Sequence, residues 1–367
     1  MEFKRLFPPT IDGTVYVEIT HRCNYACKHC YAKCPSNKEM SFSQIKQLAK
    51  TLKKNGFKKI LLTGGEPLLV SHIKDTINLL SKDFKVILIT NGTLIKEKDI
   101  DYRKLAGVYV SYDGPSEKEY KLLRGKEGLE KVHKNIKFLR KLGVKVSIGI
   151  ILTKNNINKI DELVKQAKSL DIEKINLTLV QPFGRALENK HLILKPEEYL
   201  KYIPKLSKIK DVHFESLLCF SEQLSNNSKV VKSLTLFDKY LSGCAAGKKF
   251  IYINPGGYVT PCGYITADKR LLKQSGNIFK MPLKKIYKTP LFRFFMNRSW
   301  ESVCGKCSAC NYSIICKGGC PFRAFYLKNS LKTPDPWCLN EPEKNHYIDV
   351  GVNIKNFQKE EYLVEGI

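Results

Sequence analysis

The chain has 367 residues, 43% of them hydrophobic, and its formal net charge at pH 7 is +28. No uncharged apolar run approaches the length of a transmembrane helix, roughly 20 residues, so the sequence predicts a protein without membrane spans. Thirteen cysteines without a secretion signal favour metal binding in the reducing cytoplasm over disulfide bonds. The positive charge is spread over Lys-rich segments, which we interpret as a solvated surface, or as a surface that meets an acidic partner. No aromatic-interleaved basic motif indicates nucleic acid binding.

Apolar, β-branched runs alternate with Lys-rich amphipathic segments from residue 14 to about 185. Such alternation is typical of a parallel sheet with crossover helices. Six βα units predict an α/β fold, a partial (β/α)6 TIM-like barrel, with its chemistry at the carboxyl ends of the strands. The expected strands are 14–19, 58–63, 84–90, 106–111, 145–152 and 173–180, and the expected helices 41–55, 71–82, 96–104, 117–142 and 156–170.

Three cysteines, Cys23, Cys27 and Cys30, follow the first expected strand in a Cys-x3-Cys-x2-Cys pattern. A cubane iron–sulfur cluster takes four thiolates, so three ligands on one loop would leave one iron open. An open coordination position makes a metal site reactive rather than structural. The alternative interpretation is that these three cysteines form part of a zinc site, to which His21 and His29 could contribute.

This pattern, followed by the aromatic Tyr31, resembles the signature of radical S-adenosylmethionine (SAM) enzymes. In that family the open iron chelates SAM, and reductive cleavage of SAM releases a 5′-deoxyadenosyl radical. The resemblance makes the three cysteines both cluster ligands and catalytic residues, and it places Tyr31 among the cofactor-binding residues.

The residues after the next strands extend the resemblance. Gly64, Gly65 and Glu66 match the family's GGE motif, in which the glycines let backbone N–H groups approach a ligand and the glutamate accepts from the SAM amino group. By the same resemblance Ser111 contacts the ribose and Arg124 lies near the SAM carboxylate. Four loop residues occupy positions where relatives touch cofactor or substrate, namely Asn155, Asn156, Gly184 and Arg185. Taken alone, such loop residues are turn formers.

A second set of cysteines lies between residues 244 and 338, around a strand-turn-strand pattern at 250–253 and 258–259. Their order resembles the SPASM extension of radical SAM enzymes and implies two auxiliary [4Fe–4S] clusters. The distal cluster would take Cys307, Cys310, Cys316 and Cys338. The nearer one would take Cys244, Cys262 and Cys320, with Cys304, Cys219 or an open iron as the fourth position. A pair of zinc ribbons is the alternative from spacing alone. Cys34 has no partner in either pattern, and we interpret it as structural.

The sequence predicts four parts: the barrel at 1–208, a bridging region at 209–243, the SPASM domain at 244–338 and a tail at 339–367. SPASM relatives act mostly on peptides, so the first hypothesis is a peptide-modifying enzyme that crosslinks, oxidises or epimerises its substrate. An electron donor such as flavodoxin or ferredoxin would serve it.

Sulfatase-maturing relatives carry an aspartate that serves as a base directly after the cysteine matched by Cys262. This chain has Gly263 at that position, which argues against sulfatase maturation. The second hypothesis is a radical oxidase or decarboxylase of a small molecule such as a haem precursor. A non-enzymatic binding module with zinc-stapled cysteines is the third.

Overall fold

The computed structural model describes residues 13–32, 36–206, 208–215, 243–298, 300–310 and 313–339. The described chain forms two compact units. The first comprises residues 13–194, 211–213 and 245–297, and the second residues 195–210, 214–244 and 298–339, without the undescribed positions. Cys34 and Cys219 lie outside the described residues. None of the helices in the described part combines the length and hydropathy that a membrane span requires.

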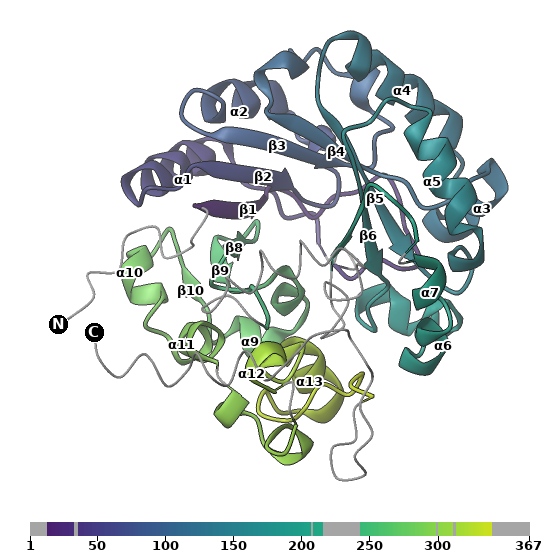
Figure 1. The fold of residues 1–367 in the computed structure, drawn as a ribbon. Coiled ribbons are helices and arrows are strands. Elements are labelled where there is room, and N and C mark those ends of the chain that lie inside the picture. The colour runs from purple at the N-terminus through teal and green to yellow at the C-terminus, as the bar shows by residue number, and fades with distance from the viewer. Residues whose placement is uncertain are drawn as a thin grey trace. The chain divides into compact units, whose positions relative to one another are not determined.

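A single sheet organises the first unit (Figure 1), and the six strands expected in the barrel are confirmed to within one residue at each end. They pair in parallel and in chain order. The carboxyl ends of parallel strands meet at one edge, so the segments that follow them come together. The strands are β1 (Thr14–Glu18), β2 (Lys59–Thr63), β3 (Lys85–Thr90), β4 (Gly107–Ser111), β5 (Val146–Leu152) and β6 (Lys174–Leu179).

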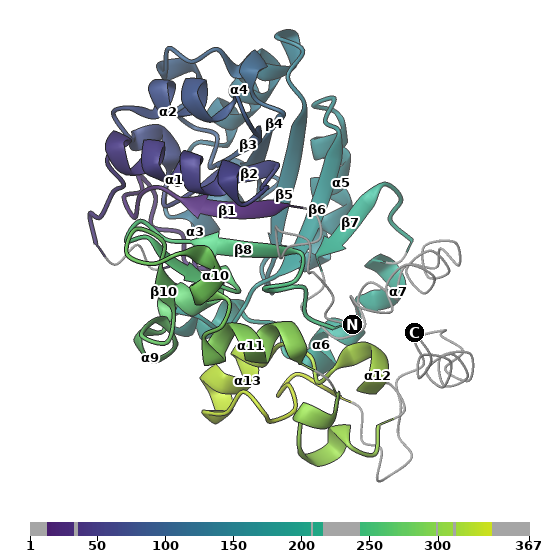
Figure 2. The ribbon, with the colours of Figure 1, turned by 90° about the vertical axis from the view of Figure 1, so that its left-hand side faces the viewer.

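Helices cover the outer face of this sheet (Figures 1 and 2). They form because apolar residues recur at helical spacing; α1, for example, buries Ile45, Leu48 and Leu52 and begins at a capping box on Ser41. The helices are α1 (Phe42–Lys54), α2 (Ile73–Leu80), α3 (Glu117–Arg124), α4 (Leu129–Lys141) and α5 (Ile160–Lys168).

Two helix predictions were wrong in detail. The segment 96–104 forms two 3₁₀ turns, Ile95–Glu97 and Tyr102–Lys104, rather than one helix. The segment 117–142 is split into α3 and α4, because Gly125 ends α3 in the left-handed conformation, with φ of 83°.

The two faces of the sheet differ in exposure. Along β1 to β4 the Val, Ile and Leu residues of one face are buried, whereas their alternating neighbours, such as Tyr16, Leu61, Ile89 and Tyr109, remain partly exposed. Side chains alternate between faces along a strand, so one face is packed and the other is reachable by solvent. We call the second face the half-exposed face.

The expected strand-turn-strand pattern is confirmed as β8 (Phe250–Ile253) and β9 (Tyr258–Thr260), which pair antiparallel. β8 also pairs in parallel with β1, with Tyr252 opposite Tyr16, so the barrel sheet continues across the boundary expected at residue 244. A further strand, β7 (Val212–Glu215), lies at the other edge of the sheet. The remaining elements are β10 (Gly276–Asn277), α6 (Pro196–Leu200), α7 (Ile203–Leu206), α9 (Lys269–Leu272), α10 (Leu283–Ile286), α11 (Pro290–Asn297), α12 (Ser313–Cys316) and α13 (Pro321–Lys328).

Candidate active site

Three thiols gather in the loop that follows β1. Cys23, Cys27 and Cys30 are each partly buried, and none forms a disulfide. Burial raises the pKa of the Cys27 thiol to about 11; the charge of Arg124 opposes this, and the charges of Cys30 and Cys23 reinforce it. The three sulfur atoms therefore lie within electrostatic range of one another. Thiols in such surroundings need a cation before they become thiolates, which is the behaviour of metal ligands.

The two glycines after β2 hold this loop in place. The N–H of Gly65 donates to Thr20 O at 2.7 Å, and the N–H of Glu66 donates to Arg22 O at 2.8 Å. A Cβ at Gly64 would lie 2.6 Å from Thr20 O, and one at Gly65 would lie 2.3 Å from Arg22 O. Only glycine allows this approach. The expectation that the glycine N–H groups point at a ligand is wrong for Gly65, whose N–H is used by the cysteine loop.

Glu66 is fully buried between β2 and β3. Its Oε1 accepts from Leu68 N at 3.1 Å and from Thr90 Oγ1 at 2.8 Å, and its Oε2 accepts from Asn91 N at 2.8 Å. A carboxylate offers about four acceptor positions, so three are occupied and about one is left. That remaining position fits an ammonium donor, and the assignment of Glu66 to the SAM amino group stays a prediction.

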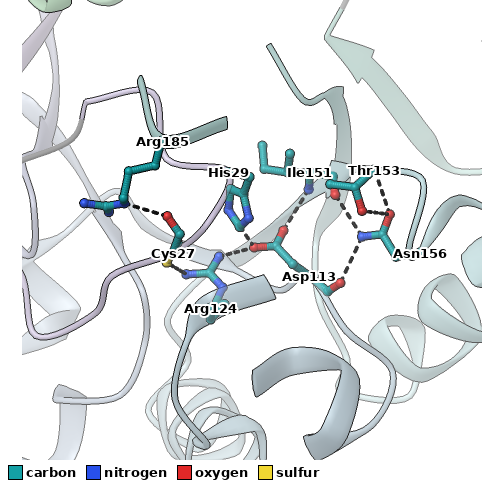
Figure 3. A network of polar contacts seen from close by, with 8 residues as sticks. All are labelled: Cys27, His29, Asp113, Arg124, Ile151, Thr153, Asn156 and Arg185. Carbon is teal, nitrogen blue, oxygen red and sulfur yellow. Dashed lines mark hydrogen bonds and ion pairs between the residues drawn. The ribbon is translucent and has the colours of Figure 1, made fainter. Parts of the chain in front are cut away.

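A buried ionic network fixes the middle of the cysteine loop (Figure 3). Arg124, at the end of α3, pairs with Asp113, and its Nη1 lies 3.9 Å from Cys27 Sγ. The Asp113 carboxylate also faces His29 Nε2 at 3.3 Å and accepts from Ile151 N at 2.8 Å. Asp113 thus connects the end of β4 with α3, β5 and the cysteine loop, and it orients the guanidinium beside Cys27.

Two loop residues from later strands complete this network (Figure 3). Arg185, which follows β6, donates from Nε to Cys27 O at 2.8 Å and from its backbone N to Cys30 O at 2.9 Å. Asn156, which follows β5, donates to Asp113 O at 2.9 Å. Their side chains therefore hold the cysteine loop and its support. Arg185 and Asn156 therefore support the candidate cluster site by hydrogen bonds.

Tyr31 and Ser111 lie at the half-exposed face. The Tyr31 ring packs edge-on against Tyr264, with centroids 4.9 Å apart, and its hydroxyl lies 3.4 Å from that of Tyr252. Ser111 ends β4 and is partly exposed opposite Gly149 of β5. Their assignments as cofactor-binding residues stay predictions, as does that of Arg124 toward the SAM carboxylate.

The second cysteine set is divided between the two units. Cys262 follows β9 in the first unit, whereas Cys244 and the other members belong to the second. Burial raises the pKa of Cys320 to about 12; Arg323 opposes this, and the charges of Asp335 and Cys244 reinforce it. Cys244 and Cys320 thus lie near each other, as their shared assignment requires. Cys307 and Cys316 are buried, Cys310 and Cys338 are half-buried, and Cys304 is exposed.

A buried ion pair supports the ligands of the second unit. Arg323 and Asp335 pair with both side chains inaccessible to solvent, and the guanidinium carbon lies 4.2 Å from the centre of the Trp337 ring. Asp335 accepts from Cys320 N at 2.8 Å through its carboxylate and from Cys338 N at 2.9 Å through its carbonyl. Asp335 therefore positions Cys320, which is expected to bind the nearer auxiliary cluster, and Cys338, which is expected to bind the distal one.

The thiol donors are compatible with both metals weighed above, because thiolates bind zinc and also the irons of a cubane. A zinc site needs its four ligands around one ion, whereas a cubane takes one thiolate on each of four irons. Three thiols on one loop fit a cubane with one open iron, and this assignment stays a prediction.

Comparisons with known proteins decide the family. Residues 17–167 match the model of the radical SAM superfamily, and residues 244–311 match SPASM, an iron–sulfur cluster-binding domain. The protein is a radical SAM enzyme with a SPASM domain. Its cofactors are therefore SAM, a [4Fe–4S] cluster that binds SAM, and the auxiliary clusters of the SPASM domain. The Cys23, Cys27 and Cys30 assignments and the auxiliary ligand sets remain predictions.

Three similar proteins cover most of the chain. The AdoMet-dependent heme synthase of Oleidesulfovibrio alaskensis is 29% identical over 90% of this chain and 88% of its own. The antilisterial bacteriocin subtilosin biosynthesis protein AlbA of Bacillus subtilis is 27% identical over 88% of this chain and 68% of its own. The crystal structure of Streptococcus suis SuiB bound to precursor peptide SuiA shares the fold, with a TM-score of 0.70, 20% identity and coverage of 91% and 76%.

Sequence reasoning missed two buried carboxylates. The sequence pattern did not single out Asp113, although it anchors the network around Cys27. Glu18 was read as one position in an apolar strand, although a charged residue inside such a run is itself a signal, because burying a carboxylate costs free energy unless it is compensated.

Proposed function

We propose that this enzyme abstracts a hydrogen atom from a C–H bond of a peptide and completes a net oxidation, such as a crosslink. When bound, SAM and its cluster supply the 5′-deoxyadenosyl radical that begins the reaction. Cys23, Cys27 and Cys30 would hold this cluster, with Arg124 and Arg185 fixing the loop. The observation that carries the proposal is the position of these three thiols in the loop directly after β1, at the carboxyl edge of the parallel sheet, where the chemistry of such folds gathers.

The peptide substrate is supported by relatives whose names state peptide chemistry, namely AlbA and the PqqA peptide cyclase of Bradyrhizobium diazoefficiens. The net charge of +28 would favour an acidic precursor. Electrons would come from an external donor of the flavodoxin or ferredoxin class. The domain division into a barrel at 1–208 and a SPASM domain at 244–338 belongs to this proposal.

A second candidate is oxidation of a haem precursor. The observation that favours it is the similarity to the heme synthase of Oleidesulfovibrio alaskensis, which spans nearly the full length of both chains. Surface Lys and Arg residues would attract the carboxylates of such a substrate as readily as those of an acidic peptide.

The experiment offers both substrates to anaerobically reconstituted enzyme with SAM and a reductant. One is a set of synthetic acidic peptides, and the other is an iron porphyrin with propionate side chains. Loss of two hydrogen atoms from a peptide, together with 5′-deoxyadenosine, supports the first proposal. Loss of carbon dioxide from the porphyrin, with the peptides unchanged, supports the second and refutes the first.

A further inference from the structure

The positive charge of the chain is concentrated in one segment, residues 269–293. This segment contains eight Lys or Arg residues and no Asp or Glu, whereas the whole chain has 63 basic and 35 acidic residues. It runs through α9, β10 and α10 into α11, which lie close together at the edge of the sheet where β10 pairs with β9 (Figures 1 and 2). All eight cationic side chains are exposed, namely Lys269, Arg270, Lys273, Lys280, Lys284, Lys285, Lys288 and Arg293. The Lys-rich surface of the protein is therefore not uniform.

Most of these cations have no acidic neighbour. On the helices that cover the sheet, exposed lysines pair with carboxylates, as Lys53 of α1 does with Asp83 at 2.6 Å. In the segment 269–293 Arg270 pairs with Asp268, whereas the other seven cations pair with no carboxylate in the described part of the chain. Like charges close together repel one another, and a bound anion relieves that repulsion. The segment is therefore suited to a polyanionic partner.

An exposed methionine lies among these cations. Met281 is 38% exposed and stands between Lys280 and the start of α10. A Cβ at Gly276 of β10 would lie 2.9 Å from Met281 Sδ and 2.6 Å from Ile286 Cγ1, so this glycine allows the methionine and α10 to pack closely on the edge strand. A thioether side chain adapts its shape to different apolar partners. The segment thus offers one adaptable apolar contact that is flanked by ammonium groups.

The basic surface continues toward the cysteine loop. Lys280 N donates to Asn277 O at 3.1 Å, and Asn277 Nδ2 donates at 2.7 Å to Gly256 O in the turn between β8 and β9. A Cβ at Gly256 would lie 3.0 Å from Lys38 Nζ, so a further exposed ammonium stands beside this turn. Lys38 O accepts from His21 N at 2.8 Å, two residues before the first cysteine of the loop. Exposed cations therefore lead from α10 to the beginning of the cysteine loop.

We propose that this basic surface, made of Lys38 and the cations of residues 269–293 around Met281, binds an acidic segment of the peptide substrate. This inference rests on the proposed function and adds the place where the substrate docks. A peptide held there by its acidic segment keeps its other residues near the cysteine loop. Their effective concentration at the site of the radical is raised by that attachment.

The composition of the surface favours carboxylates on a flexible chain. Six of the eight cations in the segment are lysines, which are point charges on flexible stems, whereas phosphate groups are matched best by the planar fork of arginine. Nucleic acid bases stack on exposed aromatic rings, and every aromatic ring in residues 269–293 is buried or half-buried. The cations are also spread along α9, α10 and α11, which suits a chain of carboxylates better than a compact haem precursor.

The first test measures binding without turnover. The probe is a fluorescein-labelled synthetic peptide of glutamates with one leucine, and its fluorescence anisotropy is followed with anaerobically reconstituted enzyme. One variant reverses three charges around Met281, in Lys280→Glu/Lys284→Glu/Lys285→Glu. The matched control has the same net charge and reverses three exposed lysines in and after α1, in Lys50→Glu/Lys54→Glu/Lys58→Glu. Glutamate near the start of α10 is favoured by the helix dipole, so the first variant should fold, and iron content and urea unfolding check this.

The dissociation constant of the probe should rise about 10-fold or more in the first variant, because three favourable charge contacts become repulsive. In the control it should rise by less than about 2-fold, because only the net charge changes there. Equal weakening in both variants overturns the inference, since binding would then depend on the field of the whole protein. Tighter binding of a labelled single-stranded oligonucleotide of equal charge to wild type, lost in the first variant, also overturns it, because the surface would then belong to nucleic acid.

The second test uses a synthetic acidic peptide that wild type modifies. Its KM should rise in the first variant by about the same factor as the dissociation constant, with kcat close to wild type, because docking away from the reacting atoms is lost equally in the ground state and the transition state. A lower kcat with an unchanged KM overturns the inference. So does a loss of turnover with reduced flavodoxin that dithionite restores, which would assign the surface to the electron donor. If wild type modifies none of the peptides, the proposed function fails, and the anisotropy measurement still decides whether the surface binds acidic peptides.

Discussion

Replacing Asp113 by alanine should be among the most damaging single changes in the barrel unit. Asp113 is fully buried, and the Arg124 side chain is only 5% exposed. Removing one partner of a buried ion pair typically costs about 3–5 kcal/mol, because the other charge stays buried without compensation. The N–H of Ile151 would also lose its acceptor, which adds about 1–3 kcal/mol if no water replaces it. Against a typical total stability of about 5–15 kcal/mol, this is a large fraction.

The assay is equilibrium urea unfolding followed by far-ultraviolet circular dichroism, with iron content measured on the same samples. Asp99→Ala is the matched control, since Asp99 pairs with Lys74 on the surface with its side chain 92% exposed. Exposed pairs contribute about 0–1 kcal/mol, so the control should unfold close to wild type. Asp113→Ala should unfold at much lower urea and should lose iron, because Arg124 no longer has a fixed orientation at Cys27.

A double variant separates the ion pair from general damage. Asp113→Ala combined with Arg124→Met removes the stranded charge, so it should be less destabilised than the sum of the two single variants. The reasoning about Asp113 fails if Asp113→Ala unfolds within about 1 kcal/mol of Asp99→Ala, a difference within the range of surface pairs. It also fails if the double variant shows no coupling.

Four further changes have defined outcomes. Gly65→Ala should displace the cysteine loop, since its Cβ would lie 2.3 Å from a backbone carbonyl, and iron analysis should show loss of about one cubane. Asp335→Ala strands Arg323 and removes the acceptor of the Cys320 N–H, so it should cost about 3–5 kcal/mol in urea unfolding and lower the auxiliary-cluster EPR signals, with SAM cleavage kept. Cys27→Ala should abolish 5′-deoxyadenosine formation while the auxiliary signals persist; continued cleavage would show the loop assignment to be wrong. The pKa of Glu18 is raised from 4.5 to about 8 in the folded state, so between these pH values the folded protein holds a proton that the unfolded chain has lost. The free energy of unfolding should therefore fall by a few kcal/mol as pH rises from about 4.5 to 8, and urea unfolding of Glu18→Gln should not show this pH dependence.

The six barrel strands could be predicted because each is a short β-branched run between polar segments, so local pattern and tertiary position agree. The break between α3 and α4 was also encoded locally, by Gly125 and Gly128, and was missed because the apolar period continues across it. The parallel pairing of β8 with β1 could not be read from the sequence. It joins residues more than 230 positions apart, and no turn or spacing records such a contact.

The cysteines could be found by spacing, whereas the supporting roles of their neighbours could not. Arg185 and Asn156 were named as positions where relatives touch cofactor or substrate, but their hydrogen bonds hold the cysteine loop and Asp113. Asp113 stands in the sequence of an ordinary turn. Their roles depend on which strand ends meet, which is a property of the sheet order. Gly65 shows the opposite error: its motif was recognised, but its N–H serves the loop rather than a ligand.

Glu18 and Asp113 give the clearest contrast in the unit. Both are buried carboxyls at strand ends close to the cysteine loop. Asp113 meets a guanidinium, an imidazole and a backbone N–H, so its charge is compensated and its oxygens are used in holding the loop. Glu18 meets the phenol of Tyr252, the thiol of Cys30 and, at 3.9 Å, the imidazole of His21, and one of its oxygens has no hydrogen-bond partner. The buried carboxyl that has partners holds the loop, whereas the one that lacks them has its pKa raised to about 8 by burial.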